Sequence, residues 1–132
     1  MIVMAKPTEK QIIGRLGEDI AVKYLENKGF SIIGRNYLKK CGEIDIIAKN
    51  VAVVHFVEVK TVSEFANSET DSYRPEDNLH PYKLKRLARV IQLYLFEKHS
   101  NGAPRWVFDV ITVRLDTKNK KARLELLPNI II

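Results

Sequence analysis

Two apolar runs with a helical segment between them constrain the fold more than any other feature of the sequence. The first, 51–59, is interrupted only by His55 and Glu58, and the second, 106–113, is almost continuously apolar. Such runs are typical of buried strands. The segment after Pro81 carries apolar residues at helical spacing up to a Ser-Asn-Gly-Ala-Pro break at 100–104. A strand, a helix and a strand in a short domain predict a right-handed crossover, so the two runs should be parallel strands of one sheet.

The other segments predict a helix before these strands and further strands around them. Thr8 and Gln11 fit a capping box, and Gly29, after Asn27 and Lys28, predicts the C-terminal end of this helix. Strands are predicted over 30–38, 43–48, 51–61, 106–113 and about 122–127, with a hairpin turn at Asn50 and a turn at 116–119. The chain of 132 residues is therefore predicted to be one α/β domain, a mixed β-sheet flanked by helices in the order α, β, β, β, α, β, β. The polar, acidic stretch at about 62–80 predicts a long loop, which we expect to move.

Composition excludes several classes of protein. No apolar run reaches the roughly 18 to 20 residues that span a bilayer, and the first residues lack the pattern of a secretory signal. Cys41 is the single cysteine, so neither an internal disulfide nor a cysteine-rich zinc site can form, and we expect a cytoplasmic protein. The net charge of +6 favours a polyanionic partner.

Three charged residues occupy strands that should be buried. Asp45 lies within Ile-Asp-Ile-Ile, and Glu58 and Lys60 lie within Phe-Val-Glu-Val-Lys. Isolated charges are costly to bury, so the three suggest a site. Glu58 and Lys60 share a strand face. A hairpin loop with an even number of residues turns Asp45 to that face, opposite either Val54 or Phe56, and the second register places it diagonal to Glu58, whereas an odd loop turns it away.

The chemistry expected of these residues is metal-assisted hydrolysis. Two carboxylates without a thiol or a histidine cluster suit a hard divalent ion, Mg²⁺ or Mn²⁺. A lysine beside them can hold an attacking water or stabilise charge on a phosphate.

The same residues carry a family resemblance. Asp45, followed after twelve residues by Glu58-Val59-Lys60, resembles the PD-(D/E)xK nuclease signature. Further motifs resemble the YraN-like family of bacterial proteins, whose pattern is similar to that of archaeal Holliday-junction resolvases. They are Gly17-Glu18, Arg35-Asn36, Gly42-Glu43-Ile44-Asp45, Tyr94-Leu95 and Phe108-Asp109-Val110-Ile111.

The resemblance implies a restriction-endonuclease-like fold and roles for four residues. Asp45 and Glu58 would be metal ligands, Lys60 the catalytic lysine, and Glu18 an acid that supports the metal directly or through water. The chain departs from the family pattern after Lys60, where Thr61 and Val62 replace a frequent basic residue.

Ordinary structural roles remain open for the same residues. Glu58 and Lys60 alone could form a salt bridge on a solvated face, and Glu18 could be a surface acid of its helix. Asp109, in an apolar strand, is interpreted as a buried acid satisfied by the backbone or a basic side chain rather than as catalytic. Gly14 and Gly17 lack the context of a phosphate loop, and we interpret them as permitting close helix packing.

Basic residues complete the prediction. Lys39 and Lys40 lie at the first hairpin, and Lys83 and Arg86 lie in the first half of the second helix, where they could contact phosphates. The chain is thus interpreted as a Mg²⁺-dependent or Mn²⁺-dependent endonuclease-like hydrolase acting on DNA, including branched, repair or recombination intermediates. The apolar residues 126–127 and 130–132 are compatible with a homodimer interface. The alternative is a non-catalytic module with the same fold that binds nucleic acid or recruits a partner.

Overall fold

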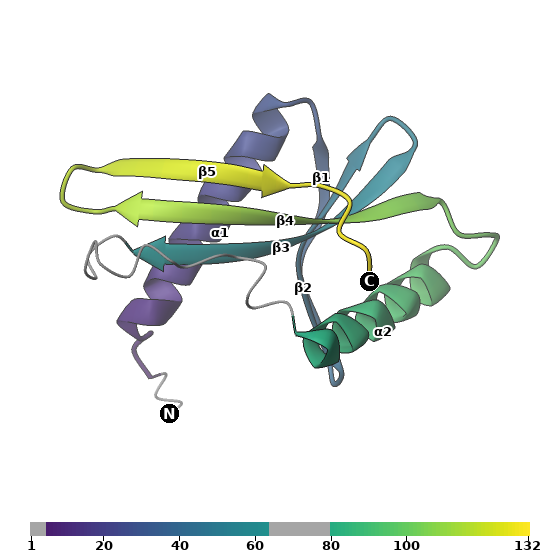
Figure 1. Ribbon diagram of the computed structural model, residues 1–132. Coiled ribbons are helices and arrows are strands. Elements are labelled where there is room, and N and C mark those ends of the chain that lie inside the picture. Colours follow the sequence, from purple (N-terminus) through teal and green to yellow (C-terminus); the bar gives the residue numbers. More distant parts are fainter. Residues whose placement is uncertain (1–4, 64–79) are drawn as a thin grey trace.

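The computed structural model describes residues 5–63 and 80–132, which form one five-stranded mixed sheet and two helices (Figure 1). The predicted α/β class and element order are confirmed. The elements are α1 (Glu9–Asn27), β1 (Ser31–Lys39), β2 (Gly42–Asn50), β3 (Val53–Ser63), α2 (Pro81–Lys98), β4 (Arg105–Asp116) and β5 (Lys121–Leu127).

The strands lie in the sheet in their order along the chain. β1 pairs antiparallel with β2, β2 antiparallel with β3, β3 parallel with β4, and β4 antiparallel with β5. The parallel pair is the one that α2 connects, so the crossover predicted from the two apolar runs is confirmed. The sheet is strongly twisted, because β1 and β2 run steeply across the direction of β3, β4 and β5 in Figure 1.

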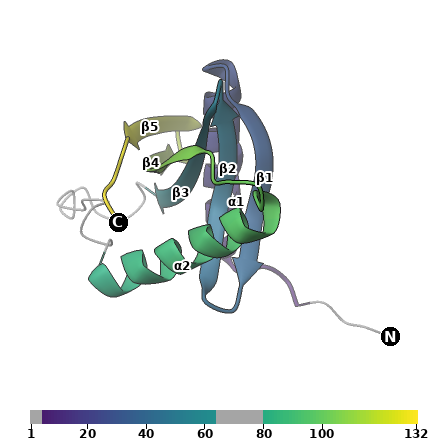
Figure 2. The same ribbon diagram turned by 90° about the vertical axis from the view of Figure 1, so that its right-hand side faces the viewer.

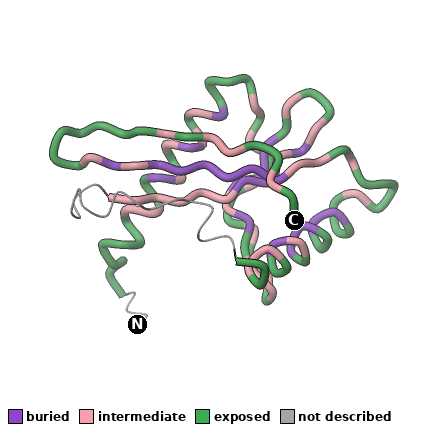
Figure 3. The backbone as a smooth tube through the Cα atoms, in the orientation of Figure 1, coloured by how far each residue is buried: buried purple, intermediate pink, exposed green. Residues whose placement is uncertain are grey.

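The two helices cover opposite faces of the sheet, and each covers its own group of buried side chains (Figure 2). Figure 3 shows buried positions along β4 and along one side of α2. The residues buried with α1 are Ala21, Leu25, Ile46, Ala48, Val57, Ile111, Val113 and Leu115. Those buried with α2 are Ile44, Ile47, Val54, Phe56, Leu87, Val90, Ile91, Tyr94, Leu95, Phe108 and Val110.

The first helix begins and ends where its sequence predicts. Thr8 Oγ1 accepts from the Gln11 backbone N–H, and Gln11 Oε1 accepts from that of Thr8, which completes the capping box. Gly29, after the helix, has a φ of 93°, a conformation that favours glycine. Gly17 is buried where the helix crosses β3, and a Cβ at this position would overlap the Thr61 side chain. Gly14 has no such neighbour, so the packing role predicted for both glycines is right for Gly17 and wrong for Gly14.

Several predicted boundaries were wrong. The hairpin turn lies at residues 51–52, with Asn50 as the last residue of β2. The strand predicted to end at Thr61 continues to Ser63 because it stays paired with β4. β4 continues to Asp116, so the next turn lies at 117–120. The predicted mobile loop falls mostly outside the described residues.

In the part of the chain that the structure describes, neither helix is long and apolar enough to cross a membrane.

Candidate functional site

The candidate site forms where β2 separates from β3. The two strands are paired from Asn50 and Val53 as far as Ile46 and Val57, and the pairing ends there. The next residue of β2 is Asp45, and the next of β3 is Glu58, so the separation begins at these two acids. The side-chain pattern of β2 changes at the same point, because Ile44 is buried with α2 and Ile46 with α1 although regular alternation would put both on one face.

Asp45 takes over part of the lost strand pairing. Its Oδ2 accepts a hydrogen bond of 2.8 Å from the backbone N–H of Val59. Burial, followed by the charge of Glu58, raises the pKa of the Asp45 carboxyl to about 7, and Glu18 and Glu43 add to this effect. Asp45 has no ion-pair partner among the described residues. A partly buried carboxylate among other acids, with no described cation beside it, favours the binding of a cation.

Glu58 is held by two lysines from different elements. Glu58 Oε1 lies 3.5 Å from Lys60 Nζ on its own strand and 3.2 Å from Lys83 Nζ on the first turn of α2. The side chains are 11%, 23% and 33% exposed for Glu58, Lys60 and Lys83, so the three are largely but not completely shielded from water. Burial and the neighbouring Lys60 hold the pKa of Lys83 below its usual range, against the opposing effect of Glu58.

Glu18 reaches the same region from α1. Its Oε1 accepts a hydrogen bond of 3.0 Å from Asn36 Nδ2, which also donates to Glu43 Oε1 at 3.0 Å. Asn36 lies level with Asp45 in the pairing of β1 with β2 and has a φ of 52°, which asparagine tolerates better than most residues. Arg35 Nη2 lies 3.9 Å from Glu18 and 2.8 Å from Asp19. The backbone irregularity of β1 thus brings an amide between two carboxylates beside Asp45.

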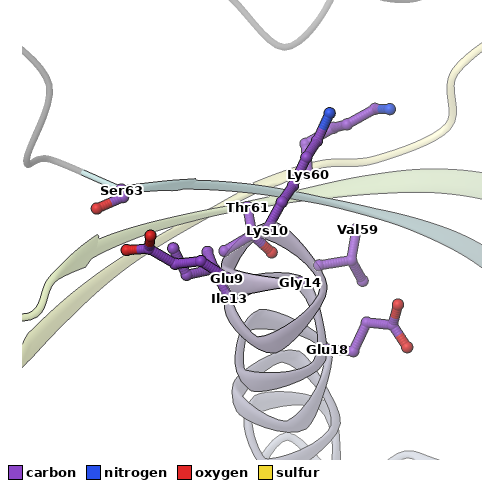
Figure 4. A pocket seen from close by; sticks show the side chains of 9 residues that line it. All are labelled: Glu9, Lys10, Ile13, Gly14, Glu18, Val59, Lys60, Thr61 and Ser63. Atoms are coloured by element: carbon purple, nitrogen blue, oxygen red, sulfur yellow. The ribbon is translucent and has the colours of Figure 1, made fainter. Parts of the chain in front are cut away.

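A pocket of about 500 Å³ opens between the first half of α1 and the last part of β3 (Figure 4). Glu18 lies toward one end of it, and Glu9 and Ser63 lie toward the other. Glu18 and Lys60 belong to its lining and to the surroundings of Asp45 and Glu58, so the pocket adjoins the candidate site. The lining also includes Lys10, Ile13, Gly14, Val59 and Thr61.

The predicted registers of Asp45 were both wrong, although the even loop on which they depended is present. Because the turn has two residues at 51–52, Asp45 comes level with Glu58, neither opposite Val54 nor diagonal to Glu58. The structure nevertheless brings Glu18, Asp45, Glu58 and Lys60 into one region.

The predicted nucleic-acid contacts lie in different surroundings. Lys39 Nζ pairs with Glu97 Oε1 at 2.9 Å, and Arg86 Nε donates to the Cys41 carbonyl at 2.9 Å. Lys40 is exposed. Lys83 is the one of the four that contacts a candidate site residue, Glu58.

Asp109 lies on the α1 side of the sheet and has structural partners. Its Oδ2 lies 2.6 Å from His55 Nδ1, and its Oδ1 accepts from the backbone N–H of Asn129 at 3.0 Å. The interpretation of Asp109 as a satisfied buried acid is therefore confirmed.

The donor set fits a small divalent ion that keeps most of its water. No group of three or more His, Cys, Asp or Glu side chains within residues 5–63 and 80–132 is arranged to hold a metal ion. Mg²⁺ does not require such a group, because one or two carboxylates, waters and substrate phosphates complete its shell. Asp45 and Glu58 would supply the carboxylates.

Sequence reasoning gave Asn36 no role in this region, and it predicted Lys83 as a phosphate contact without its contact to Glu58. Asn36 joins Glu18 to Glu43 only because of the backbone conformation of β1, and Lys83 reaches Glu58 only because the crossover brings α2 over β3. The Arg35-Asn36 motif was the available signal for Asn36, whereas no local pattern links Lys83 to Glu58.

Comparisons with known proteins agree on one family. Residues 17–113 match the model of the "Uncharacterised protein family UPF0102". Two curated relatives from Clostridium botulinum strains 657 and Hall, each named a UPF0102 protein, are 36% identical over 117 residues and 37% identical over 120 residues. Each alignment covers 89% of this chain and 91% of the relative. A UPF0102 protein from Dictyoglomus turgidum is 34% identical over 117 residues, which cover 89% of this chain and 94% of the relative.

Proposed function

The chain belongs to the uncharacterised protein family UPF0102, and we propose that it is a metal-dependent nuclease that hydrolyses phosphodiester bonds in DNA. The observation that carries the proposal is the partly buried Asp45 carboxylate, unpaired with any described cation, next to Glu58 at the point where two strands separate. The PD-(D/E)xK resemblance of Asp45, Glu58 and Lys60 supports it, and the mixed five-stranded sheet with a helix on each face is compatible with the fold that this resemblance implies.

Asp45 and Glu58 would together hold one Mg²⁺ or Mn²⁺ ion. Bound there, the ion would activate a water for attack and polarise the phosphate. Asp45 offers the oxygen that Val59 does not occupy, and the Val59 N–H fixes the orientation of the carboxylate. Asn36 keeps Glu18 close to this position, where Glu18 can accept a hydrogen bond from water.

The two lysines would act on the substrate. Without a cation, Lys60 and Lys83 neutralise Glu58. With a divalent ion at Glu58, the attraction of this carboxylate for the two ammonium groups would be weaker, and both lysines would be available to a phosphate. There they would stabilise the negative charge that builds up during attack. The basic residues Lys39, Lys40 and Arg86 would contact phosphates farther from the reacting bond.

The proposal is tested by cleavage of single-stranded, duplex and branched DNA with and without Mg²⁺ or Mn²⁺. We expect either ion to support cleavage of at least one substrate, and Asp45→Asn and Glu58→Gln each to lower the rate by at least about a hundredfold. Asp19→Asn is the matched control, because Asp19 neighbours Glu18 but is 63% exposed and pairs with Arg35. Undiminished cleavage by the Asp45→Asn, Glu58→Gln double variant would reject the assignment.

A non-catalytic module that binds nucleic acid is the second candidate function, favoured by the ion pairs that occupy Glu58. Titration calorimetry separates the two. Binding of nucleic acid without binding of either divalent ion, and without cleavage, would select the module.

A further inference from the structure

The outer side of the first two turns of α2 carries an exposed aromatic ring with an arginine over it. Tyr82 is 72% exposed, whereas Tyr94 on the inner side of the same helix is 8% exposed. The Arg86 guanidinium lies 5.9 Å from the centroid of the Tyr82 ring. Arg86 is itself held in place, because its Nε donates to the carbonyl of Cys41 at 2.9 Å. The two side chains form a pair that contributes little to the core.

The part of α2 that carries this pair is basic. Residues 81–96 include Lys83, Lys85, Arg86 and Arg89 and no acidic residue. Arg89 lies one helical turn beyond Arg86, and Lys85 is exposed. A polyanion is therefore the ligand whose charge this side of α2 complements.

The pair also lies close to the candidate site along the helix. Lys83, the neighbour of Tyr82 in the sequence, reaches Glu58 at 3.2 Å from the same helical turn. A nucleic acid whose phosphate approached Glu58 and Lys60 would therefore lie near the end of α2 that carries Tyr82 and Arg86. Aromatic rings and guanidinium groups bind nucleobases by stacking, independently of sequence.

We propose that Tyr82 and Arg86 form a stacking surface for an unpaired nucleobase, so that this chain prefers nucleic acids that present single-stranded nucleotides over uninterrupted duplex. The inference rests on the proposed function in taking nucleic acid as the ligand, and it adds the structural class of the substrate. Bases inside a duplex are stacked on each other, whereas those of single strands and at branch points have a free face.

The test measures binding of the full chain to a fluorescein-labelled oligothymidylate and to a blunt-ended hairpin duplex, at one salt concentration and in EDTA. EDTA removes divalent ions, so the measurement does not depend on catalysis. We expect tighter binding of the oligothymidylate, and for Tyr82→Ala a loss of affinity of about fivefold or more for that probe, against less than about twofold for the duplex. Tyr82→Phe, which keeps the ring, should bind as the parent chain does.

Lys85→Ala is the matched control for charge, and we expect it to weaken both probes equally. Circular dichroism of Tyr82→Ala checks that the fold is retained. Three results would overturn the stacking surface: Tyr82→Ala weakens binding of both probes equally, Tyr82→Ala weakens binding of neither probe, or Tyr82→Phe loses affinity. None of these results would contradict the proposed nuclease activity, which the cleavage assay tests separately. Failure of the parent chain to bind either probe would overturn both the stacking surface and nucleic acid as the ligand.

Discussion

Asp45 has two tasks that oppose each other in the absence of a cation. As an acceptor for Val59, it replaces a backbone partner that β3 loses when β2 turns away. As a partly buried carboxylate near Glu58, Glu18 and Glu43, it is costly to ionise. This conflict is resolved by a bound proton at low pH or by a cation at neutral pH.

Asp45→Asn should therefore change the pH dependence of stability in metal-free buffer. The folded-state pKa of Asp45, about 7, lies above its ordinary value of 3.8, so the folded chain binds more protons than the unfolded chain between these values. Stability from this group is lost as pH rises through that interval. Asparagine keeps an acceptor for Val59 without the charge. The free energy of unfolding of Asp45→Asn minus that of the parent chain should grow by up to about 1.4 kcal/mol per pH unit between pH ~5 and ~7 and then level off.

Urea unfolding at several pH values in EDTA measures this difference. Asp19→Asn serves as the control, because Asp19 is exposed. A difference between Asp45→Asn and the parent chain that stays constant with pH would contradict the assigned burial of charge.

Individual site residues could be predicted from the sequence where a charged residue occurs within an apolar strand, because an isolated charge is costly to bury. Asp45 and Glu58 were found in this way, and Asp109 was assigned to a structural role on the same reasoning. The method fails for Lys83, because a lysine near a helix start is ordinary and its contact with Glu58 arises from packing between elements.

At the level of elements, α1 approaches the sheet closely at one glycine and not at the other. Gly17→Ala should lower the free energy of unfolding by about 1–3 kcal/mol, because the added methyl overlaps Thr61. Gly14→Ala, with nothing near its Cβ, should raise it by about 0.5–1 kcal/mol through helix propensity. Thermal unfolding of the pair tests this, and equal effects of the two substitutions would exclude a close contact at Gly17.

The β2–β3 turn contains a residue poorly suited to its conformation. Val51 has a φ of 56° and is 91% exposed, so its side chain gains nothing from packing that offsets the backbone strain. Val51→Gly should stabilise the fold by about 0.5–1 kcal/mol, since glycine adopts this conformation freely. Ala52→Gly is the control and should destabilise it, because Ala52 is not among the residues with positive φ. Chemical denaturation of both variants decides the point, and a destabilised Val51→Gly would contradict the turn geometry.

The same turn explains why the register of β2 on β3 was predicted wrongly. Hydrophobic periodicity predicted every helix and strand, because it reports which face of an element is buried. Capping and helix-breaking residues marked the ends of the helices. The register of β2 on β3 depends on a turn at Val51 and Ala52, neither of which is a turn-forming residue, whereas the preceding Asn50 is one. The turn was therefore assigned too early, and Asp45 was displaced relative to Glu58.

At the level of the whole molecule, the candidate site draws side chains from α1, β2, β3 and α2, so a ligand bound there should hold several elements together. An ion present at ten times its dissociation constant adds about 1.4 kcal/mol to stability, which corresponds to roughly 3–5 °C in Tm. We expect Mg²⁺ or Mn²⁺ to raise Tm in this way and the Asp45→Asn, Glu58→Gln double variant to lose the shift. Calorimetric scans in which neither ion alters the Tm of the parent chain would argue against a metal site.

A homodimer remains a prediction. Leu126, Leu127 and Ile130 pack partly against the core, and Ile131 is 92% exposed, so less apolar surface is free than the sequence suggested. Sedimentation of the full chain with and without DNA would measure the oligomeric state.

The hydrogen bond between Asp45 and Val59 has a bearing on which metals the site would select. Because one Asp45 carboxylate oxygen accepts a hydrogen bond from the backbone, bidentate coordination of the ion by this carboxylate is disfavoured. Calcium has a larger radius and a coordination number of about six to eight, and it often uses bidentate carboxylates. Magnesium binds monodentate carboxylates and retains several of its water ligands. Calcium should accordingly be the poorer occupant, and its substitution for magnesium should slow turnover.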